Sequence, residues 1–337
     1  MLQQIARELK YFLTIPKEIV IISHRNPDGD AIGSSLGLAT FLRRNFHSVT
    51  VIFPSEYPYS FGFLDGIHRS VIFDLQPDDC RKAIANAQLI FCLDFNGLDR
   101  IDKLGEAVQF SHARKVLIDH HLDPEPFADD IISDTGSSST SELVYLFIRE
   151  LAGKLVIDSV IGDSLFTGII TDTGSFKYNT RPETFRVAAE LKEAGVDDSV
   201  LQDKIFNSLK EKHLRLLGHC LANRMEIIKD YGVGIIYLSK KDYADFDIQR
   251  GDTEGIVNHM LLIRDIQVAA FVTEQPTVIK ISLRSKGDIS VQEIATKYFN
   301  GGGHKNASGG GVYASLQDVI QKLKKVIPLH IPKLVNL

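Results

Sequence analysis

The stretch EIVIISHRNPDGDAIGSSLGLATFLRRN, residues 18–45, decides the fold of the first half of the chain. It opens with a continuous apolar run, 18–24, that ends in a polar residue, a pattern typical of a strand buried on both faces of a parallel sheet. The polar segment 25–30 contains Pro, Asp and Gly, which predict a turn. Apolar residues at helical spacing follow over 31–45. The stretch therefore predicts a buried strand, a short loop and a helix.

This alternation continues beyond residue 45. Further strands are predicted at 48–53, 88–94, 113–119 and 130–133, and helices at 139–151 and 157–170. Strands that alternate with helices predict an α/β fold, here a Rossmann-like, mostly parallel sheet in a domain of residues 1–185. The segment 186–228 has helical spacing throughout and no Pro-rich or Ser-rich linker, so we expect a helical connector there.

A smaller α+β domain is expected at 229–337. Its predicted strands are 232–239, 266–273, 277–284 and 310–315, and its predicted helices are 253–262, 290–299 and 316–327. A glycine-rich turn is expected after the second of these helices. We see no internal repeat and no low-complexity tract.

Bulk composition favours a globular protein of the cytoplasm. Apolar residues make up 44% of the 337 residues, and no stretch approaches the roughly 20 uninterrupted apolar residues that span a bilayer. The N-terminus carries charge and has no apolar core, so no signal peptide is expected. The three widely spaced cysteines predict neither a disulfide framework nor structural zinc.

The net charge of −5 hides an asymmetry along the chain. Residues 1–200 hold 19 Lys and Arg against 29 Asp and Glu, and residues 201–337 hold 19 against 14, which gives −10 and +5. An acidic lobe is what a cluster of metal-binding carboxylates produces, and a basic lobe can bind a phosphate-bearing substrate. The alternative is that the charge is distributed unevenly over the surface and has no functional role.

Three predicted strands end at their carboxyl ends in polar residues: His24, Asp94 and Asp119. Ligand sites in open α/β sheets lie outside the carboxyl ends of the strands. One strand that ends in Asp means little, because Asp commonly terminates strands. Three strands with metal-competent residues at this edge indicate a shared site.

Other candidate ligands lie close to these strand ends. Asp28 and Asp30 flank a glycine just before a predicted helix, although a turn with a helix cap is the better explanation of DGD alone. His120 and His121 follow Asp119, and two adjacent histidines after a buried strand are hard to explain by structure alone. Asp172 follows a helical run, in TGIITDTGSF.

The order HxxxDxD, Asp at a strand end, DHH and a later Asp in GIxTDTGxF resembles the DHH phosphoesterase superfamily. The resemblance spans nearly the whole chain, because SLRSKG (282–287) and GGGHKNASGG (301–310) resemble the substrate-binding motifs of the DHHA1 domain. Length and layout look most like the nanoRNase and pAp-phosphatase group. The resemblance implies an active site in the cleft between the two domains.

The resemblance also implies two divalent ions. One would be held by His24, Asp28 and Asp94, and the other by Asp30, Asp94, His120 and Asp172, so that Asp94 bridges them. Mixed imidazole and carboxylate ligands favour Mn²⁺, with Mg²⁺ as the alternative. Such a pair of ions supports in-line attack of a shared hydroxide on phosphorus.

The remaining residues receive their roles from the same resemblance. His121 would lie beside the scissile phosphate as a donor or proton-transfer group, and Asp119 would orient it. Arg284 and His304 would bind substrate phosphate, together with backbone amides of Gly302 and Gly303. A flexible turn is the alternative for GGG. Weaker candidates are Ser282, Lys305, Tyr178, Asn179 and Arg181.

We therefore expect a metal-dependent phosphoesterase that acts on short single-stranded RNA or on 3′-phosphoadenosine 5′-phosphate (pAp), with no membrane or protein partner. Alternatives within the superfamily are a pApA phosphodiesterase, a single-strand DNA exonuclease, a polyphosphatase and a family II pyrophosphatase. A non-catalytic nucleotide-binding protein is the alternative of another class. Every expected ligand type is present at its motif position, which argues against it.

Overall fold

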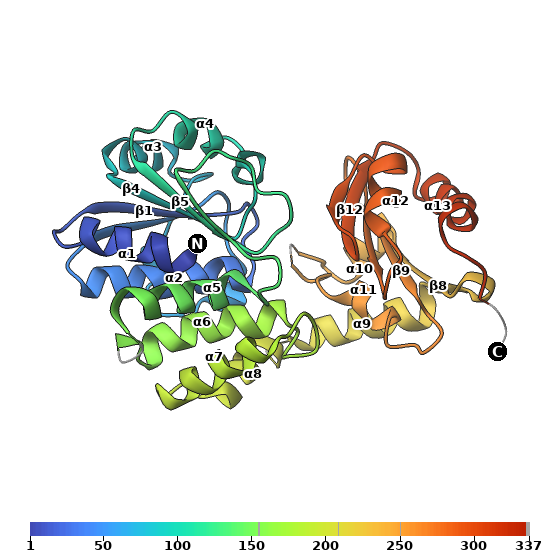
Figure 1. Ribbon diagram of the computed structural model, residues 1–337. Helices are drawn as coiled ribbons and strands as arrows, with labels where there is room; N and C mark the ends of the chain where they lie inside the picture. The colour runs from blue at the N-terminus through green and yellow to red at the C-terminus, as the bar shows by residue number, and fades with distance from the viewer. Residues whose placement is uncertain (154–155, 208, 250, 335–337) are drawn as a thin grey trace. The chain divides into compact units, whose positions relative to one another are not determined.

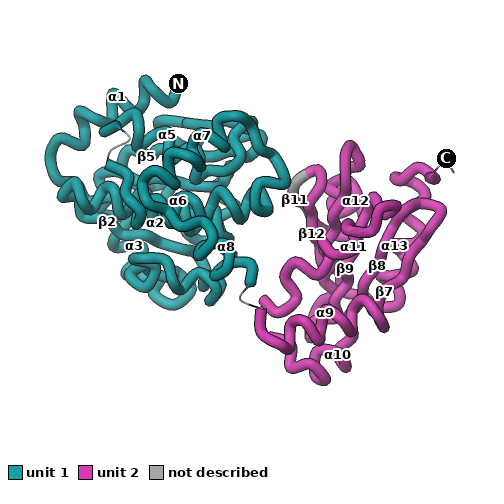
Figure 2. Tube along the Cα trace, turned by 90° about the horizontal axis from the view of Figure 1, so that it is seen from below, with its two compact units in different colours: residues 1–208 teal, residues 209–337 magenta. Residues whose placement is uncertain are grey.

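The computed structural model describes residues 1–153, 156–207, 209–249 and 251–334, except for the side chain of His304. The chain divides into two compact units, residues 1–208 and 209–337, which Figure 2 shows in different colours. No helix in the described part of the chain is both long enough and apolar enough to cross a membrane.

Unit 1 is built on a six-stranded sheet that is parallel throughout, which confirms the predicted parallel α/β fold. Its strands are β1 (Glu18–Ser23), β2 (Ser48–Phe53), β3 (Val71–Ile72), β4 (Leu89–Leu93), β5 (Arg114–Asp119) and β6 (Asp130–Ser133). Their order across the sheet is β3-β2-β1-β4-β5-β6, and every neighbouring pair is parallel. The sequence did not indicate β3, because two residues are too short for a recognisable pattern. This is the strand order of a doubly wound nucleotide-binding fold.

Helices cover both faces of this sheet (Figure 1). On one face lie α3 (Pro77–Asn86) and α4 (Leu104–Gln109), and on the other lie α1 (Leu2–Phe12), α2 (Gly29–Arg44), α5 (Thr140–Ala152) and α6 (Ser159–Asp172). Alternate residues of β1 pack into the apolar cores on opposite faces of the sheet. Ile19 and Ile21 belong to one core, and Val20 and Ile22 belong to the other. Burial on both faces explains why the strands are continuous apolar runs.

Unit 2 contains a second six-stranded sheet, of order β11-β12-β10-β9-β8-β7. Its strands are β7 (Met225–Ile228), β8 (Val233–Leu238), β9 (Val268–Glu274), β10 (Ile279–Ser285), β11 (Gly302–His304) and β12 (Ala307–Val312). Its helices are α9 (Glu211–Asn223), α10 (Lys240–Asp245), α11 (Ile256–Met260), α12 (Val291–Tyr298) and α13 (Leu316–His330). Only β8 and β9 pair in parallel, so the sheet is mixed and the unit is α+β.

The segment 186–228 contributes to both units. Helices α7 (Pro182–Glu193) and α8 (Asp198–Phe206) belong to unit 1, whereas α9 belongs to unit 2. The prediction that helix continues to residue 228 was wrong, because 225–228 form β7, which pairs antiparallel with β8. Strand pairing outweighs the weak helical pattern of this short segment.

The predicted glycine-rich turn at GGGH was also wrong in part. Gly302, Gly303 and His304 form β11, the outer strand of a hairpin with β12. A Cβ on Gly303 would lie 2.6 Å from the carbonyl oxygen of Ala307 in the facing strand. Close approach within the hairpin is therefore one reason for a glycine there.

Candidate metal site

The candidate site lies at the carboxyl edge of the parallel sheet, where the strand order reverses. His24 follows β1, Asp94 follows β4 and His120 follows β5, and these strands are adjacent. The chain leaves β1 toward β2 on one side, while β4 lies on the other, which makes this edge the switch point of the fold. The sheet thus brings together side chains that are up to 96 positions apart in the sequence.

His24, Asp28 and Asp94 form the first group of possible ligands. Their donor atoms all lie within 4.8 Å of one another. Nε2 of His24 is 3.8 Å from Oδ2 of Asp28 and 3.5 Å from Oδ2 of Asp94. Nδ1 of His24 donates a hydrogen bond to the carbonyl oxygen of Arg25 (2.9 Å), which points Nε2 at the carboxylates.

Asp30, His120 and Asp172 form a second group. Nε2 of His120 is 4.0 Å from Oδ2 of Asp30 and 3.4 Å from Oδ2 of Asp172. Two donors bonded to one ion at about 2.1 Å are at most about 4.2 Å apart, so these spacings suit a shared cation. Asp30 lies in the first turn of α2 and Asp172 is the last residue of α6.

Asp94 is close to histidines of both groups. Its Oδ2 faces His24, whereas its Oδ1 is 3.6 Å from Nε2 of His120 and 3.8 Å from Nδ1 of His121. The backbone of Asp94 is left-handed, with φ of 66°, a conformation that Asp tolerates better than most residues. All six predicted ligands are therefore gathered at one place, and their individual assignment to two ions stays a prediction.

The first turn of α5 holds two of these carboxylates, a contact that sequence reasoning missed. The amides of Thr140 and Ser141 donate to Asp30 at 2.6 and 2.9 Å, and the hydroxyl of Thr140 donates to Oδ1 of Asp94 at 3.0 Å. The run of Ser and Thr at 137–141, at the start of a predicted helix, was the available signal. All five of these side chains are buried, which is unusual for such residues.

Close packing of α2 against α6 places Asp30 inside the protein. A Cβ on Gly168 of α6 would lie 2.6 Å from Oδ1 of Asp30 and would also collide with Ser141. Glycine at this position leaves room for a buried carboxylate between three helices. Asp30 is only 1% exposed, so its charge must be balanced by groups inside the site.

Burial and crowding set the protonation of the carboxylates. Burial, together with the charge of Asp94, raises the pKa of both Asp30 and Asp172 well above 3.8. The pKa of Asp94 is lowered, because hydrogen bonding and charge from His24 outweigh its burial. Several carboxylates that repel one another, with imidazoles among them, form a donor set that a divalent cation fits.

The two imidazoles of these groups have raised pKa values. For His24, burial acts to lower the pKa, but contacts with Asp28 and Asp94 outweigh it. For His120, burial is likewise outweighed by the charges of Asp94 and Asp30. Metal binding requires neutral imidazoles and ionised carboxylates, so an incoming cation must displace these protons.

His121 points to a different partner. Its Nδ1 donates to Oδ1 of Asp119 at 2.7 Å, and Asp119 is fully buried. The carboxylate fixes both the orientation and the tautomer of the ring. His121 thus lies next to the candidate ligands, but its Nδ1 is hydrogen-bonded to Asp119. Its expected role beside the substrate phosphate stays a prediction.

The predicted substrate residues all lie in unit 2. The register of the hairpin places Arg284 opposite Ala307, and Ala307 opposite His304, so the three Cα positions form one row across β10, β12 and β11. Nη1 of Arg284 donates to the carbonyl oxygen of Leu283, and burial lowers the pKa of this guanidinium. Gly302 is exposed, with open space where a Cβ would lie. The side chain of His304 lies outside the described part of the chain.

Two of the weaker candidates, Arg181 and Lys305, bind partners outside the metal site. Arg181 donates to Glu142 and Asp134, at 2.7 Å in each case, and so belongs to a partly buried network at the start of α5. Lys305 donates to Asp288 at 2.8 Å. Tyr178 is 62% exposed.

Two family models match the chain. The DHH family, N-terminal domain, matches residues 18–169, and the DHHA1 domain matches residues 230–328. Together with relatives that are 30% or more identical over most of their length, these matches show that the chain belongs to the DHH family of phosphoesterases, in the branch that carries a DHHA1 domain.

The relatives within this family include named hydrolases. A Streptococcus mutans protein named probable bifunctional oligoribonuclease and PAP phosphatase NrnA is 31% identical over 92% of this chain and 94% of its own length. The Bacillus subtilis bifunctional oligoribonuclease and PAP phosphatase NrnA is 27% identical over 91% and 93%.

A solved structure is also similar over the full length. The crystal structure of an exopolyphosphatase-related protein from Bacteroides fragilis is 39% identical, with a TM-score of 0.94, and covers 97% of each chain.

Proposed function

We propose that this protein is a two-metal phosphoesterase that hydrolyses short oligoribonucleotides and pAp. The observation that carries the proposal is the pair of adjoining histidine and carboxylate groups at the carboxyl edge of the sheet, with Asp94 between them. The names of the NrnA relatives support the choice of substrates.

We propose Mn²⁺ as the working metal. His24, Asp28 and Asp94 would hold one ion, and Asp30, Asp94, His120 and Asp172 the other. Each ion would then have one imidazole among carboxylates, a donor set that suits Mn²⁺ better than Mg²⁺. Two bound ions would lower the pKa of a water molecule and offset charge that develops on the phosphate.

The protein's own residues divide the remaining work. Asp119 holds Nδ1 of His121, so proton transfer to or from the substrate would use Nε2 of that ring. Arg284 would bind a substrate phosphate, and its charge in a partly buried position strengthens such a contact. The backbone amides of Gly302 and Gly303 and the side chain of His304 would add further donors.

An activity panel tests the proposal. Purified protein with Mn²⁺ should release phosphate from pAp and mononucleotides from di- to pentaribonucleotides, faster than it cleaves pApA, short DNA or pyrophosphate. Tight binding of these compounds without turnover would show instead a non-catalytic nucleotide-binding protein.

Polyphosphate is the second candidate substrate, because the similar Bacteroides fragilis structure is described as exopolyphosphatase-related. Inorganic polyphosphate carries no base or sugar, so it would depend on phosphate contacts alone. Turnover of polyphosphate above that of pAp and short RNA would favour this alternative.

A further inference from the structure

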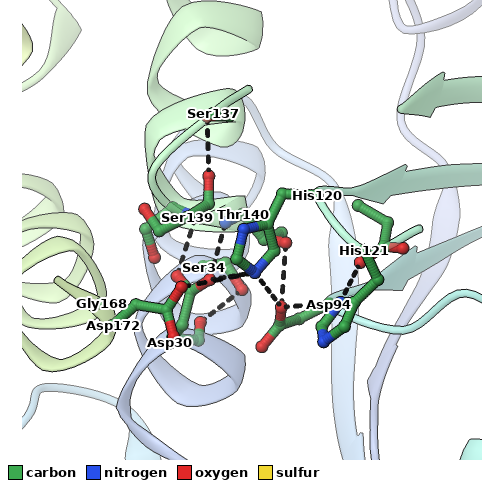
Figure 3. Close-up of polar contacts among 12 residues, drawn as sticks. Asp30, Ser34, Asp94, His120, His121, Ser137, Ser139, Thr140, Gly168 and Asp172 are labelled. Atoms are coloured by element: carbon green, nitrogen blue, oxygen red, sulfur yellow. Dashed lines mark hydrogen bonds and ion pairs between the residues drawn. The ribbon is translucent and has the colours of Figure 1, made fainter. Parts of the chain in front are cut away.

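Thr140 contacts two of the candidate ligands at once. Its amide donates to Oδ2 of Asp30 at 2.6 Å, and its hydroxyl donates to Oδ1 of Asp94 at 3.0 Å. The side chain is fully buried, so these contacts are shielded from bulk solvent. Figure 3 shows Thr140 above the carboxylates of Asp30 and Asp94.

A polar network centred on the buried Glu142 anchors the turn that carries Thr140. Glu142, which is 0% exposed, accepts from the hydroxyl of Ser138 and from the hydroxyl of Thr184, each at 2.6 Å. Nε of Arg181 donates to the other carboxylate oxygen of Glu142 at 2.7 Å, and Nη1 of Arg181 donates to Asp134. Ser139 caps the helix by accepting from the amide of Glu142. Both sides of residue 140 are thereby fixed.

We propose that Thr140 is a positioning residue of the metal site: it fixes the carboxylates of Asp30 and Asp94 relative to each other before a cation binds. This inference rests on the proposed two-metal function. It extends that function by assigning a task to a residue that would contact neither metal nor substrate.

The physical reason is the repulsion between these carboxylates. Asp30 and Asp94 are both buried, and when both are ionised and no cation is present their charges repel each other. Neutral donors on a rigid helix turn hold both oxygens in place and do not compete with the cation for its ligands. Partners of this kind that orient ligands typically change metal affinity by about 10–100-fold.

The test compares a substitution that removes the hydroxyl group with one that keeps it. Thr140→Val keeps the shape of threonine and removes the donor, whereas Thr140→Ser keeps the donor. Each metal-free protein is titrated with Mn²⁺ alone by calorimetry, and unfolding temperature in EDTA is measured in parallel. We expect Thr140→Val to bind Mn²⁺ about 10–100-fold more weakly and Thr140→Ser to bind within about threefold of the wild type.

Activity supplies a second readout. If the hydroxyl only positions ligands, saturating Mn²⁺ should restore most of the kcat of Thr140→Val. Thr40→Val is the matched control, because Thr40 is a buried threonine of α2, ten positions beyond Asp30. Its Mn²⁺ affinity should equal that of the wild type.

Three outcomes overturn the inference. These are Mn²⁺ affinity of Thr140→Val within twofold of the wild type, equal weakening in Thr140→Val and Thr140→Ser, or equal weakening in the Thr40→Val control. If valine prevents folding, Thr140→Ala and Thr140→Ser provide the same comparison, because alanine and serine differ only by the hydroxyl.

The same titration distinguishes failure of the proposed function from failure of the inference about Thr140. If the wild-type protein binds no Mn²⁺ in the same titration, the two-metal proposal is wrong, and the inference about Thr140 falls with it. If the wild type binds Mn²⁺ and Thr140→Val binds it equally well, only the inference is wrong.

Discussion

Asp94 combines a left-handed backbone with a side chain that is only 3% exposed. One of its carboxylate oxygens faces His24 and the other faces His120, so Asp94 contacts a histidine of each group. Residues in sparsely populated backbone regions persist only where the surroundings fix them, and they are frequent at functional sites. The amide of Asp94 donates to the carbonyl oxygen of Ile118 in β5, which helps to fix this turn.

Replacement of Asp94 should abolish turnover. Asp94→Asn is the cleaner variant, because Asn also tolerates a left-handed backbone, whereas Ala would add strain. We expect kcat/KM on pAp to fall by more than about 100-fold, beyond what loss of an orienting partner causes. Asp99→Ala, an exposed residue of the following turn, is the control. Near-normal turnover of Asp94→Asn would rule out a bridging role.

Arg284 belongs to the other unit and should affect substrate binding. We expect Arg284→Ala to raise KM for pAp by about 10-fold or more, with kcat and Mn²⁺ affinity little changed, because a charged hydrogen bond to phosphate is lost. Lys280→Ala removes an exposed cation from the same strand and serves as the control. Loss of Mn²⁺ binding in Arg284→Ala would contradict its placement as a substrate residue.

Helix α5 depends on the ion pair between Glu142 and Arg181. Without Arg181 the carboxylate of Glu142 stays buried with only neutral donors. We expect Arg181→Met to lower the free energy of unfolding by about 2–4 kcal/mol, slightly below the ~3–5 kcal/mol of a fully buried pair because Arg181 is 28% exposed. Urea denaturation in EDTA measures this change.

Two further variants identify the cause of that loss. The double variant Arg181→Met with Glu142→Gln should recover part of the stability, since no buried charge remains. Arg186→Met removes an arginine that is 66% exposed and pairs with Glu183, so it should cost less than about 1 kcal/mol. Equal losses in Arg181→Met and Arg186→Met would mean that burial of the pair is unimportant.

Protons and metal compete for the site, which makes the stability of the protein depend on pH. His24 and His120 have pKa values raised above 6.5 in the folded state, so the stabilisation they provide is complete below about pH 6.5 and is lost as pH rises through the raised values. The raised pKa values of Asp30 and Asp172 also make the folded state less stable as pH rises, over the range from 3.8 to their raised values. The lowered pKa of Asp94 acts oppositely, but only below 3.8.

We therefore expect the metal-free protein to unfold at a lower temperature at about pH 8 than at about pH 6. Mn²⁺ should raise the unfolding temperature by more at the higher pH, because fewer protons must leave. Scans in EDTA and in Mn²⁺ measure both effects, and His120→Gln should flatten the slope in EDTA. An increment from Mn²⁺ that does not change with pH would contradict this explanation.

Much of this architecture follows from local sequence patterns. The strands of unit 1 were predictable because burial on both faces requires long apolar runs, and His24, Asp94 and His120 were candidates because they follow such runs. Strand β3 and strand β7 were not predictable, because they are short and exist only through pairing with β2 and β8. Strand β11 was not predictable either, because its glycines are typical of a turn and the strand is defined by its pairing with β12.

The sequence by itself determined the class of fold and the kinds of ligand atom at the strand ends, since both depend on local patterns and residue types. Only the tertiary structure decided that Asp94 lies between the two histidine groups and that α5 donates to it and to Asp30. The contacts from α5 join residues more than 40 positions apart, and packing of α2, α5 and α6 sets their distances. Local preference carries no information about which distant side chains meet.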